Sequence, residues 1–251
     1  MQKIINTTDV NNKIEFNIIG HVNSPYKEKF AIPRQPGLVS SAKGTITLAG
    51  EANNAELVRE LAQFSHIWLL FVFHGTQEQG WKPLVRPPRL GGNKKIGVFA
   101  TRSTFRPNPI GMSVVKLDAI DIKNQQVILH ISAIDLLDKT PIIDIKPYVP
   151  YSDSIPHANA GFAQTQPLAN LQVTFNEQAK IAITQHSENF PDLALFIEQV
   201  LAQDPRPAYK QGKIDDKIYG MNLYDLNIQW QMQGLTSIEV IDIMPATSST
   251  G

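Results

Sequence analysis

The feature that most constrains the fold is a series of short apolar segments between Ile14 and about Ile145, separated by glycine, proline and asparagine. They include FNIIGHV, GTITLAG, HIWLLFVFH, IGVFAT, SVVKLDAIDI and QVILHISAI. Short apolar runs bounded by turn residues are typical of β-strands, and the last two, joined by KNQQ, form a predicted hairpin. Many short strands with one helical segment predict a closed or partly closed β-barrel rather than a doubly wound sheet.

The one helical pattern in this region is NNAELVRELAQF, residues 53–64. Asn53 is followed three residues later by Glu56, which is the spacing of a helix capping box. The pattern therefore predicts a helix whose apolar face consists of Leu57, Val58, Leu61 and Phe64.

The composition changes after Tyr151: residues 153–169 are polar and are predicted to form a linker. Residues 170–245 then predict a small α+β domain: a strand and helix in LQVTFNEQAKIAITQH, a second helix starting at Pro191, and a hairpin around Gln233–Gly234. The second helix has an apolar stripe of Leu193, Phe196, Ile197, Val200 and Leu201. The full prediction is a flexible N-terminus (1–13), a β-barrel domain (14–152), the linker, the α+β domain and a tail (246–251).

Charge is balanced overall, with 23 basic and 23 acidic residues, but it is segregated along the chain. The segment from Lys82 to Leu117 contains no Asp or Glu, so it predicts a local positive face rather than a uniformly basic surface. The alternative is that these side chains are scattered over solvated faces. The basic residues of the segment are Lys82, Arg86, Arg89, Lys94, Lys95, Arg102, Arg106 and Lys116.

Several classes of chemistry are disfavoured. The chain has no cysteine, which excludes disulfides, thiolate nucleophiles and cysteine-ligated metals. Glycine-rich phosphate loops and G-x-S-x-G are absent. The first residues do not resemble a signal peptide, and the longest apolar run, Ile67–Phe73, is too short to span a bilayer. A cytoplasmic protein without a membrane partner is therefore expected.

Two histidines, His66 and His74, share one face of a predicted strand, but no third ligand has a diagnostic spacing. We therefore expect no metal and favour a His66 packed beside Trp68. His74 ends its strand just before Gly75 and is expected at a rim.

Three loops are stiffened by proline and carry polar side chains. They are FAIPRQPGL (30–38) with Arg34 and Gln35, GVFATRSTFRPNPIGMS (97–113) with two arginines, and LLDKTPIIDIKPYVPY (136–151) with Asp138 and Asp144. A loop that is already ordered loses less entropy when a ligand binds. Prolines also shape barrel corners, but three such loops together favour a binding site.

These stretches resemble the TsaA-like family of bacterial tRNA methyltransferases. The resemblance rests on IGHVNSPYKEKFAIPRQPGL, FSHIWLLFVFH, PPRLGGNKKIGVFATRSTFRPNPIGMSVVKL and TPIIDIKPYVPY, spread over about Ile18–Tyr151. Near the C-terminus, AQDPRPAYK and YDLNIQW extend it over nearly the whole chain.

The resemblance implies a non-Rossmann β-barrel that binds S-adenosylmethionine and works as a homodimer. It also implies methylation of N6 of N6-threonylcarbamoyladenosine at position 37, in the anticodon stem–loop of threonine tRNA, with no DNA partner. This chain reads DKTP where the family commonly has DGTP, so Lys139 stands in for a glycine. The implied donor-binding residues are Pro33, Arg34, Gln35, Phe73, His74, Arg102, Met112, Leu136, Leu137, Asp138 and Lys139.

For catalysis, the ureido N6–H has to lose its proton, and Asp138 is the first candidate base, with His74 second and Asp144 behind them. A role for Asp138 in binding the donor is slightly favoured over a role as base. Arg106 is a candidate for the RNA or for the threonyl carboxylate. Arg206 is a candidate RNA contact and equally a partner of Asp204 at a helix end. The predicted RNA-binding residues are Arg86, Arg89, Lys94, Lys95, Arg106, Tyr148, Arg206 and Tyr209, with Tyr148, Tyr151 and Tyr209 offering stacking surfaces.

Two alternatives remain open. One is an RNA- or nucleotide-binding module without catalysis, which would need the basic segment but not Arg34, Gln35 or Asp138. The other is a methyltransferase of the same fold with a different acceptor.

Overall fold

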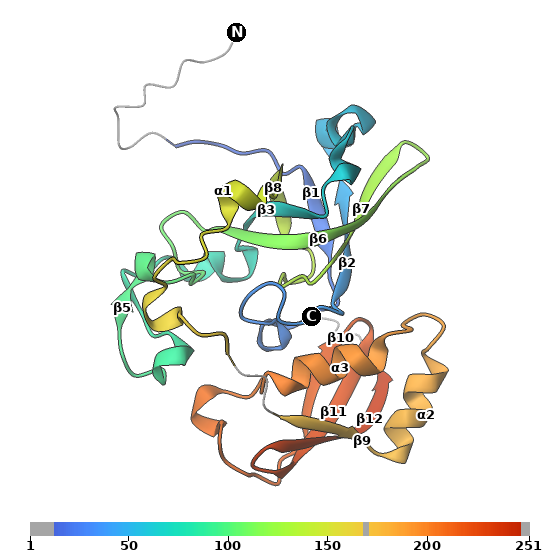
Figure 1. Cartoon of the computed structure of the whole chain (residues 1–251). Helices are drawn as coiled ribbons and strands as arrows, with labels where there is room; N and C mark the ends of the chain where they lie inside the picture. Colours follow the sequence, from blue (N-terminus) through green and yellow to red (C-terminus); the bar gives the residue numbers. More distant parts are fainter. Residues whose placement is uncertain (1–12, 168–170, 247–251) are drawn as a thin grey trace.

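A computed structural model describes residues 13–167 and 171–246, and it contains a β-barrel followed by a smaller α+β part (Figure 1). The barrel closes in the order β1-β2-β7-β6-β3-β8, with antiparallel pairing throughout. The predicted mainly β fold, a small barrel with an α+β C-terminal part, is confirmed. The barrel strands are β1 (Gly20–Asn23), β2 (Lys43–Leu48), β3 (His66–Val72), β6 (Ile110–Lys123), β7 (Gln126–Ser132) and β8 (Pro141–Pro147).

Alternating burial along the strands builds the barrel core. In β3, Ile67, Leu69 and Phe71 are buried, whereas the residues between them are partly exposed. Successive side chains of a strand point to opposite faces, so this alternation fills the interior and leaves the other face to solvent. The predicted hairpin is β6–β7, and it turns at Asn124 and Gln125, which both have positive φ (50° and 64°).

The predicted helix over 53–64 is wrong. The segment forms separate 3-10 turns at Gly50–Ala52, Ala55–Val58 and Leu61–Gln63, interrupted by Glu60 at a φ of 65°. Asn53 caps no helix, because its side-chain oxygen accepts a 2.8 Å bond from the Val127 N–H. Tertiary hydrogen bonding to the β6–β7 hairpin overrides a weak local propensity.

The connection between β3 and β6 has little regular structure beyond a two-stranded ribbon. This ribbon consists of β4 (Leu84–Val85) and β5 (Ile96–Gly97). The barrel is followed by a short helix, α1 (Pro150–Asp153). Further 3-10 turns of the described residues are η1 (Lys29–Ala31), η5 (His74–Gln79), η6 (Pro88–Leu90), η7 (Val98–Ala100), η8 (Gly161–Ala163) and η9 (Ala208–Lys210).

The C-terminal part is a four-stranded sheet of order β10-β11-β12-β9 with two helices. The buried stripe predicted for the second helix is confirmed, because all five of its residues are buried. The predicted hairpin is β11–β12, and it turns at Leu235 and Thr236, just after Gln233–Gly234. The elements are β9 (Gln172–Phe175), α2 (Glu177–Gln185), α3 (Leu193–Ala202), β10 (Tyr219–Leu223), β11 (Leu226–Gly234) and β12 (Ser237–Pro245).

The segment between β1 and β2 joins the two parts. Tyr26 forms an isolated β-bridge with Leu223, and its ring, which is 0% exposed, lies 5.7 Å from that of Phe196. The Ser41 hydroxyl donates a 2.7 Å bond to the side-chain oxygen of Gln199 in α3. One end of the barrel is therefore packed against the C-terminal sheet and helices.

The predicted domain boundaries stay a prediction, and the expected loose N-terminus and tail lie almost entirely outside the described residues. Within the part of the chain that the structure describes, no helix is long and apolar enough to cross a membrane.

Candidate functional site

The three proline-stiffened loops begin or lie at one end of the barrel, which we call the barrel mouth (residues 24–42, 73–109 and 133–140). β1, β3 and β7 end there, and β2, β6 and β8 begin there, as the strand registers show. Because neighbouring strands are antiparallel, segments far apart in sequence meet at this end. The mouth is also the end of the barrel that faces the C-terminal part (Figure 1).

Two of the predicted donor-binding residues bond directly across loops. The Arg102 guanidinium donates a 2.7 Å hydrogen bond to the side-chain oxygen of Gln35. Arg34 is exposed beside them, and Pro33 is buried beneath the loop. The structure thus joins the first and second stiff loops through their polar side chains.

Phe73 is positioned by a close backbone approach. Its N–H donates to the Pro109 carbonyl at 2.8 Å, and its ring meets that of Phe71 edge to face at 5.1 Å. A Cβ on Gly111 would come within 2.4 Å of the Phe71 ring and 2.8 Å of the Phe73 ring. Glycine at this position therefore lets both aromatic rings pack over β6.

His74, the next residue, is half-buried at the start of η5. Burial lowers the pKa of its imidazole, and the neighbouring Lys29 and His21 lower it further, whereas a backbone hydrogen bond at Val72 and the Asp138 carboxylate oppose the shift. The imidazole is consequently neutral near pH 7 and able to accept a proton. The ammonium of Lys29 bonds to the carbonyl of Gly75 beside it.

Asp138 fastens two segments of the mouth together. Its carboxylate accepts a 2.9 Å bond from the Ser24 N–H and a 2.7 Å bond from the Lys27 ammonium. Its own N–H donates to the Tyr26 carbonyl. Both carboxylate oxygens thus already have donors, so the first role of Asp138 is to hold the loop that precedes β2.

Lys139, at the position where the resemblance implies glycine, has a glycine-like conformation, with a φ of 62°. Its N–H donates to the Val22 carbonyl at 2.8 Å, and its ammonium donates to the Asn23 side-chain oxygen at 2.8 Å. The loop therefore has a left-handed backbone at this position even with lysine, and lysine adopts that conformation at an energetic cost.

Asp135 is a mouth residue that sequence analysis missed. Burial raises the pKa of its carboxyl from 3.8 to about 6, although a hydrogen bond from Ser113, its own backbone N–H and the charge of Arg102 oppose the shift. The pairing of Lys116 with Ser132, continued three residues further, puts Ser113 opposite Asp135. Only this register would have revealed the pair, because the two residues lie 22 positions apart.

Met112 and Asp144 are not brought into this cluster. Both lie within strands rather than in the mouth loops: Met112 of β6 and Asp144 of β8 pair with Leu70 of β3 from opposite sides. Met112 alternates with the buried Ser113 and is 53% exposed on the outer face. Asp144 forms an ion pair with Lys146 at 2.8 Å. Leu136, by contrast, is buried beneath the mouth, and Leu137 lies against Gly75.

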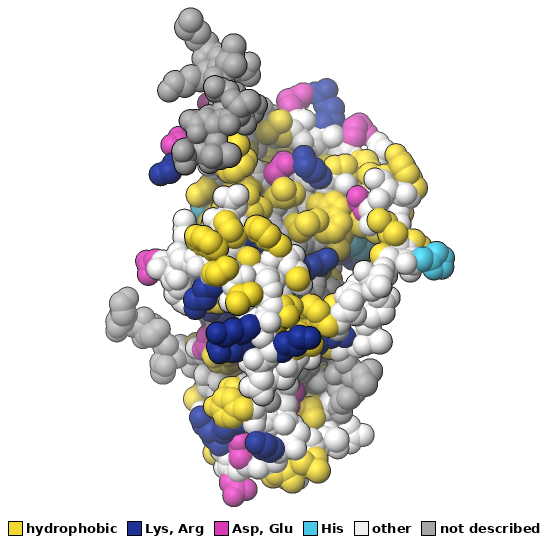
Figure 2. Space-filling model, turned by 90° about the vertical axis from the view of Figure 1, so that its left-hand side faces the viewer, with side chains coloured by type: hydrophobic (Ala, Val, Ile, Leu, Met, Phe, Trp, Pro, Cys, Tyr) yellow, Lys and Arg dark blue, Asp and Glu magenta, His cyan; other side chains and the backbone are white. Residues whose placement is uncertain are grey.

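A cationic groove of about 1400 Å³ opens beside Arg102. Its described lining includes no Asp or Glu. The basic segment seen in the sequence therefore contributes to a positively charged surface. Figure 2 shows Lys and Arg side chains across the middle of this face, with hydrophobic side chains among them. The lining cations are Arg34, Lys82, Arg86, Arg89, Lys95 and Arg102.

The residues predicted to bind RNA fall into different environments. Arg86, Arg89 and Lys95 line the groove, and Arg89 also bonds to Thr165, which holds the segment before 168 against the groove. Lys94 is exposed but is not part of the lining. Arg106 donates a 2.7 Å bond to the Thr101 carbonyl and stabilises its turn.

The predicted tyrosines lie away from the groove. Tyr148 packs against Trp68 and His66, with ring centroids 5.8 Å and 6.4 Å apart. Tyr209 is 72% exposed and lines neither the groove nor the cleft described below. His66 is exposed, bonds to Ser65 and meets the ring of Tyr148, which itself packs against Trp68. No group of three His, Cys, Asp or Glu side chains able to hold a metal occurs in residues 13–167 and 171–246.

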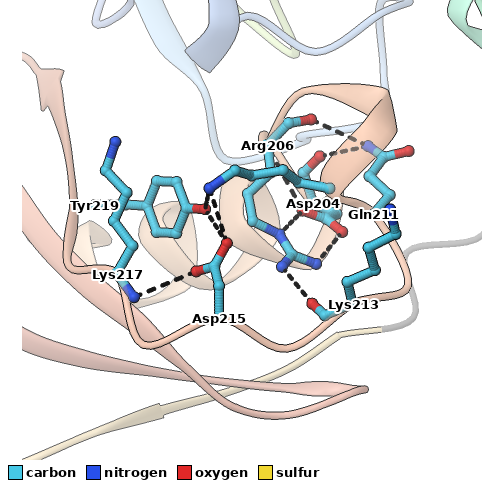
Figure 3. Close-up of polar contacts among 8 residues, drawn as sticks. Asp204, Arg206, Gln211, Lys213, Asp215, Lys217 and Tyr219 are labelled. Carbon is cyan, nitrogen blue, oxygen red and sulfur yellow. Dashed lines mark hydrogen bonds and ion pairs between the residues drawn. The ribbon is translucent and has the colours of Figure 1, made fainter.

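Arg206 is a structural residue, so the predicted RNA contact is not supported (Figure 3). Its residue exposure is 3%, and its guanidinium binds the Asp204 carboxylate at 2.7 and 2.8 Å. The third guanidinium nitrogen, Nη1, donates to the Lys213 carbonyl at 2.8 Å. These bonds organise the loop between α3 and β10, which is the alternative role considered for this arginine.

Family models match both parts of the chain: the tRNA-methyltransferase O N-terminal domain over residues 21–154, and the TrmO C-terminal domain over residues 168–246. The chain is 53% identical to the tRNA (adenine(37)-N6)-methyltransferase of Escherichia coli K12, over 87% of this chain and 93% of that protein. It is 46% identical to a Pseudomonas aeruginosa protein provisionally named an S-adenosylmethionine-dependent methyltransferase, over 90% and 95% of the two chains.

The fold matches solved structures as well. A crystal structure of TrmO from Pseudomonas aeruginosa superposes with a TM-score of 0.78 at 39% identity, covering 92% of this chain and 98% of that one. The similarity thus extends over the barrel and the C-terminal part together.

Proposed function

The chain belongs to the tRNA-methyltransferase O family, and from that membership we propose that it transfers a methyl group from S-adenosylmethionine to N6 of adenosine 37 in tRNA. The finer proposal is that the acceptor is N6-threonylcarbamoyladenosine in threonine tRNA. The observation that carries the proposal is that the family's two domains match the chain while its barrel mouth gathers Gln35, Arg102, Phe73 and His74.

The groups at the mouth fit the methyl donor. S-adenosylmethionine has a carboxylate, an ammonium, an adenine and a cationic sulfonium. Arg102 and Arg34 suit the carboxylate, the Gln35 amide suits hydrogen bonding to a polar edge, and Phe73 offers an aromatic surface. The partly buried Asp135 carboxyl suits a cationic group. When bound, the donor supplies an electrophilic methyl group on sulfur.

The protein's own residues then have to orient the acceptor, exclude water and remove the N6 proton. Because the imidazole of His74 is neutral near pH 7, a ring nitrogen of His74 accepts that proton in the mechanism we propose. Asp138 has a positioning role, since it fastens the loop that carries Lys27 and Lys29. The order of the candidate bases is thereby reversed, with His74 ahead of Asp138.

The cationic groove serves the RNA. Arg86 and Lys95 on its wall suit phosphate contacts, which position a nucleic acid without reading its sequence. Arg102 lines the same groove, so phosphates bound there lie next to the donor site that we propose.

The decisive experiment combines the purified protein with S-adenosylmethionine and tRNA that carries N6-threonylcarbamoyladenosine. Mass spectrometry of the digested nucleosides should show the N6-methylated product, and tRNA from a deletion strain should lack it. An unchanged nucleoside profile in both assays would exclude the proposed reaction. Calorimetry of the protein with S-adenosylmethionine alone should show binding, which a module that only binds RNA would not give.

We also propose that the protein is a cytoplasmic homodimer, as the resemblance implies. Light scattering of the purified protein at several concentrations tests the dimer, and a monomer mass throughout would refute it.

A further inference from the structure

Phe99 is a large apolar side chain that is 77% exposed on the wall of the cationic groove. Other apolar side chains of the chain are exposed too, Phe16 at 58% among them, so what distinguishes Phe99 is its place among the cations of the groove. The ring is also held in place. η7 is closed by a 3.1 Å bond from the Thr101 N–H to the Val98 carbonyl, and the Arg106 guanidinium lies 5.7 Å from the Phe99 ring centroid. Phe99 therefore presents an ordered aromatic surface beside cations.

Phe30 has a similar place in a second cavity. This interdomain cleft, of about 870 Å³, lies between the segment 29–39 of the barrel mouth and the C-terminal part. Phe30 is 54% exposed on its wall, between Lys29 and Arg34, which line the cleft too.

The cleft contains an unsatisfied donor. Trp230 lines it, is 2% exposed, and has an indole N–H with no acceptor among the described residues. Its ring stacks on Tyr219 at 4.5 Å, which fixes its orientation. The N–H itself is closed to solvent, so Trp230 offers no hydrogen bond to a ligand in the cleft.

The groove and the cleft adjoin. Arg34, Leu38, Pro88 and Pro167 line both of them. Single-stranded nucleic acids bind in grooves that combine cations for the phosphates with aromatic rings on which bases stack. Both elements occur in each cavity: Phe99 with Arg86 and Lys95 in the groove, and Phe30 with Lys29 in the cleft.

We propose that the groove and the cleft form one track for the single-stranded part of the substrate RNA, in which Phe99 and Phe30 each stack an unpaired base that flanks the acceptor. This rests on the proposed function, because the RNA is its substrate. Stacking thus falls to two phenylalanines rather than to Tyr148, Tyr151 and Tyr209, none of which lines either cavity.

The test uses the full chain with Phe99→Ala, Phe30→Ala and Phe99→Trp. Phe16→Ala is the matched control, because Phe16 is similarly exposed, at 58%, and lines neither cavity. Fluorescence anisotropy gives the Kd for the anticodon stem–loop at several salt concentrations, and calorimetry gives the Kd for S-adenosylmethionine.

Each alanine variant should weaken RNA binding by roughly 5- to 100-fold, the effect of losing one stacked base. Phe99→Trp and Phe16→Ala should stay within about 3-fold of the unsubstituted protein, since one keeps the stack and the other never had one. The salt dependence of binding should keep its slope, because no phosphate contact is removed. Binding of S-adenosylmethionine should not change.

Two results would overturn the track. One is RNA binding by both alanine variants that equals that of the control; the other is a change in the salt slope. If the unsubstituted protein neither binds nor methylates the RNA, the proposed function fails. If it does both while the phenylalanine variants match it, only the stacking proposal fails.

Discussion

The guanidinium of Arg102 lies 2.7 Å from the side-chain oxygen of Gln35, which joins two loops whose residues are 67 positions apart. Neither side chain has to be ordered anew when a ligand arrives, because each already restrains the other. The charge of the same arginine partly opposes the rise that burial causes in the pKa of Asp135, so Arg102 also acts on this carboxyl.

Arg102→Ala should weaken binding of S-adenosylmethionine by about 10- to 100-fold, the usual effect of removing a charged hydrogen-bonding group. The thermal midpoint should hardly move, because the side chain is exposed. Calorimetry measures the affinity and circular dichroism the midpoint. The control is Arg59→Ala, an exposed arginine that pairs with Glu56 outside the mouth. A variant that loses stability without losing affinity would make Arg102 a structural residue.

Asp135→Asn should make the pH dependence of stability diverge from that of the unsubstituted protein. The folded pKa of Asp135, about 6, is above its ordinary value of 3.8, so the protonated carboxyl favours folding and this contribution is lost as the pH rises from about 4 to 6. Asparagine keeps a neutral group throughout. The variant should therefore gain about 1–3 kcal/mol in unfolding free energy above pH 6 and nothing near pH 4.

Urea unfolding at several pH values between 4 and 8 measures this difference. Carboxyls with lowered pKa values, such as Asp121 and Asp153, have the opposite effect: their contribution to the free energy of unfolding is lost as the pH falls. Both proteins contain these carboxyls, so their effects cancel in the comparison. Parallel curves for the two proteins would show that burial does not perturb Asp135.

His74→Gln should remove the acidic limb of the pH–rate profile. Burial and nearby positive charge lower the His74 pKa, so the unsubstituted enzyme should lose activity only below about pH 6.5. The kcat for methyl transfer should fall by roughly 100-fold in the variant, the size of a general-base effect. Single-turnover rates from pH 5 to 8 give the profile. An acidic limb that survives in the variant would assign it to another group, with Asp135 first in line.

Lys139→Gly should stabilise the protein by roughly 0.5–1 kcal/mol, because glycine adopts a φ of 62° without the penalty that lysine incurs and part of that gain is offset by a more flexible unfolded chain. Lys139→Ala is the control: it removes the ammonium bonded to Asn23 but keeps the strained conformation, so it should bring no gain. Chemical denaturation ranks the three proteins. A glycine variant no more stable than the alanine variant would place the strain elsewhere.

Arg206→Ala should destabilise the C-terminal part by about 3–5 kcal/mol, because it leaves Asp204 partly buried without its partner. Lys213→Ala should be neutral, since Lys213 contributes only its backbone carbonyl to the cluster. Thermal unfolding compares them. Reduced RNA affinity with unchanged stability in the Arg206 variant would restore the RNA contact that burial argues against.

Local patterns were sufficient for the strands and for the stripe on α3, because alternation and helical spacing report directly on which side chains are buried. They failed for residues 53–64, where hydrogen bonds from Asn53 to the β6–β7 hairpin decide the conformation. They failed for Asp135 as well, because only the strand register puts it opposite Ser113.

Local sequence was enough to predict the barrel strands, the basic segment and the three stiff loops, since each is recognised from residues that are close together in the chain. Which polar groups meet depends on the folded chain as a whole. The tertiary structure put Arg102 beside Gln35, took both oxygens of Asp138 for the loop before β2, and enclosed Arg206 with Asp204. Closure of an antiparallel barrel brings distant loops to one end, and no local pattern of residues encodes which of their side chains come into contact there.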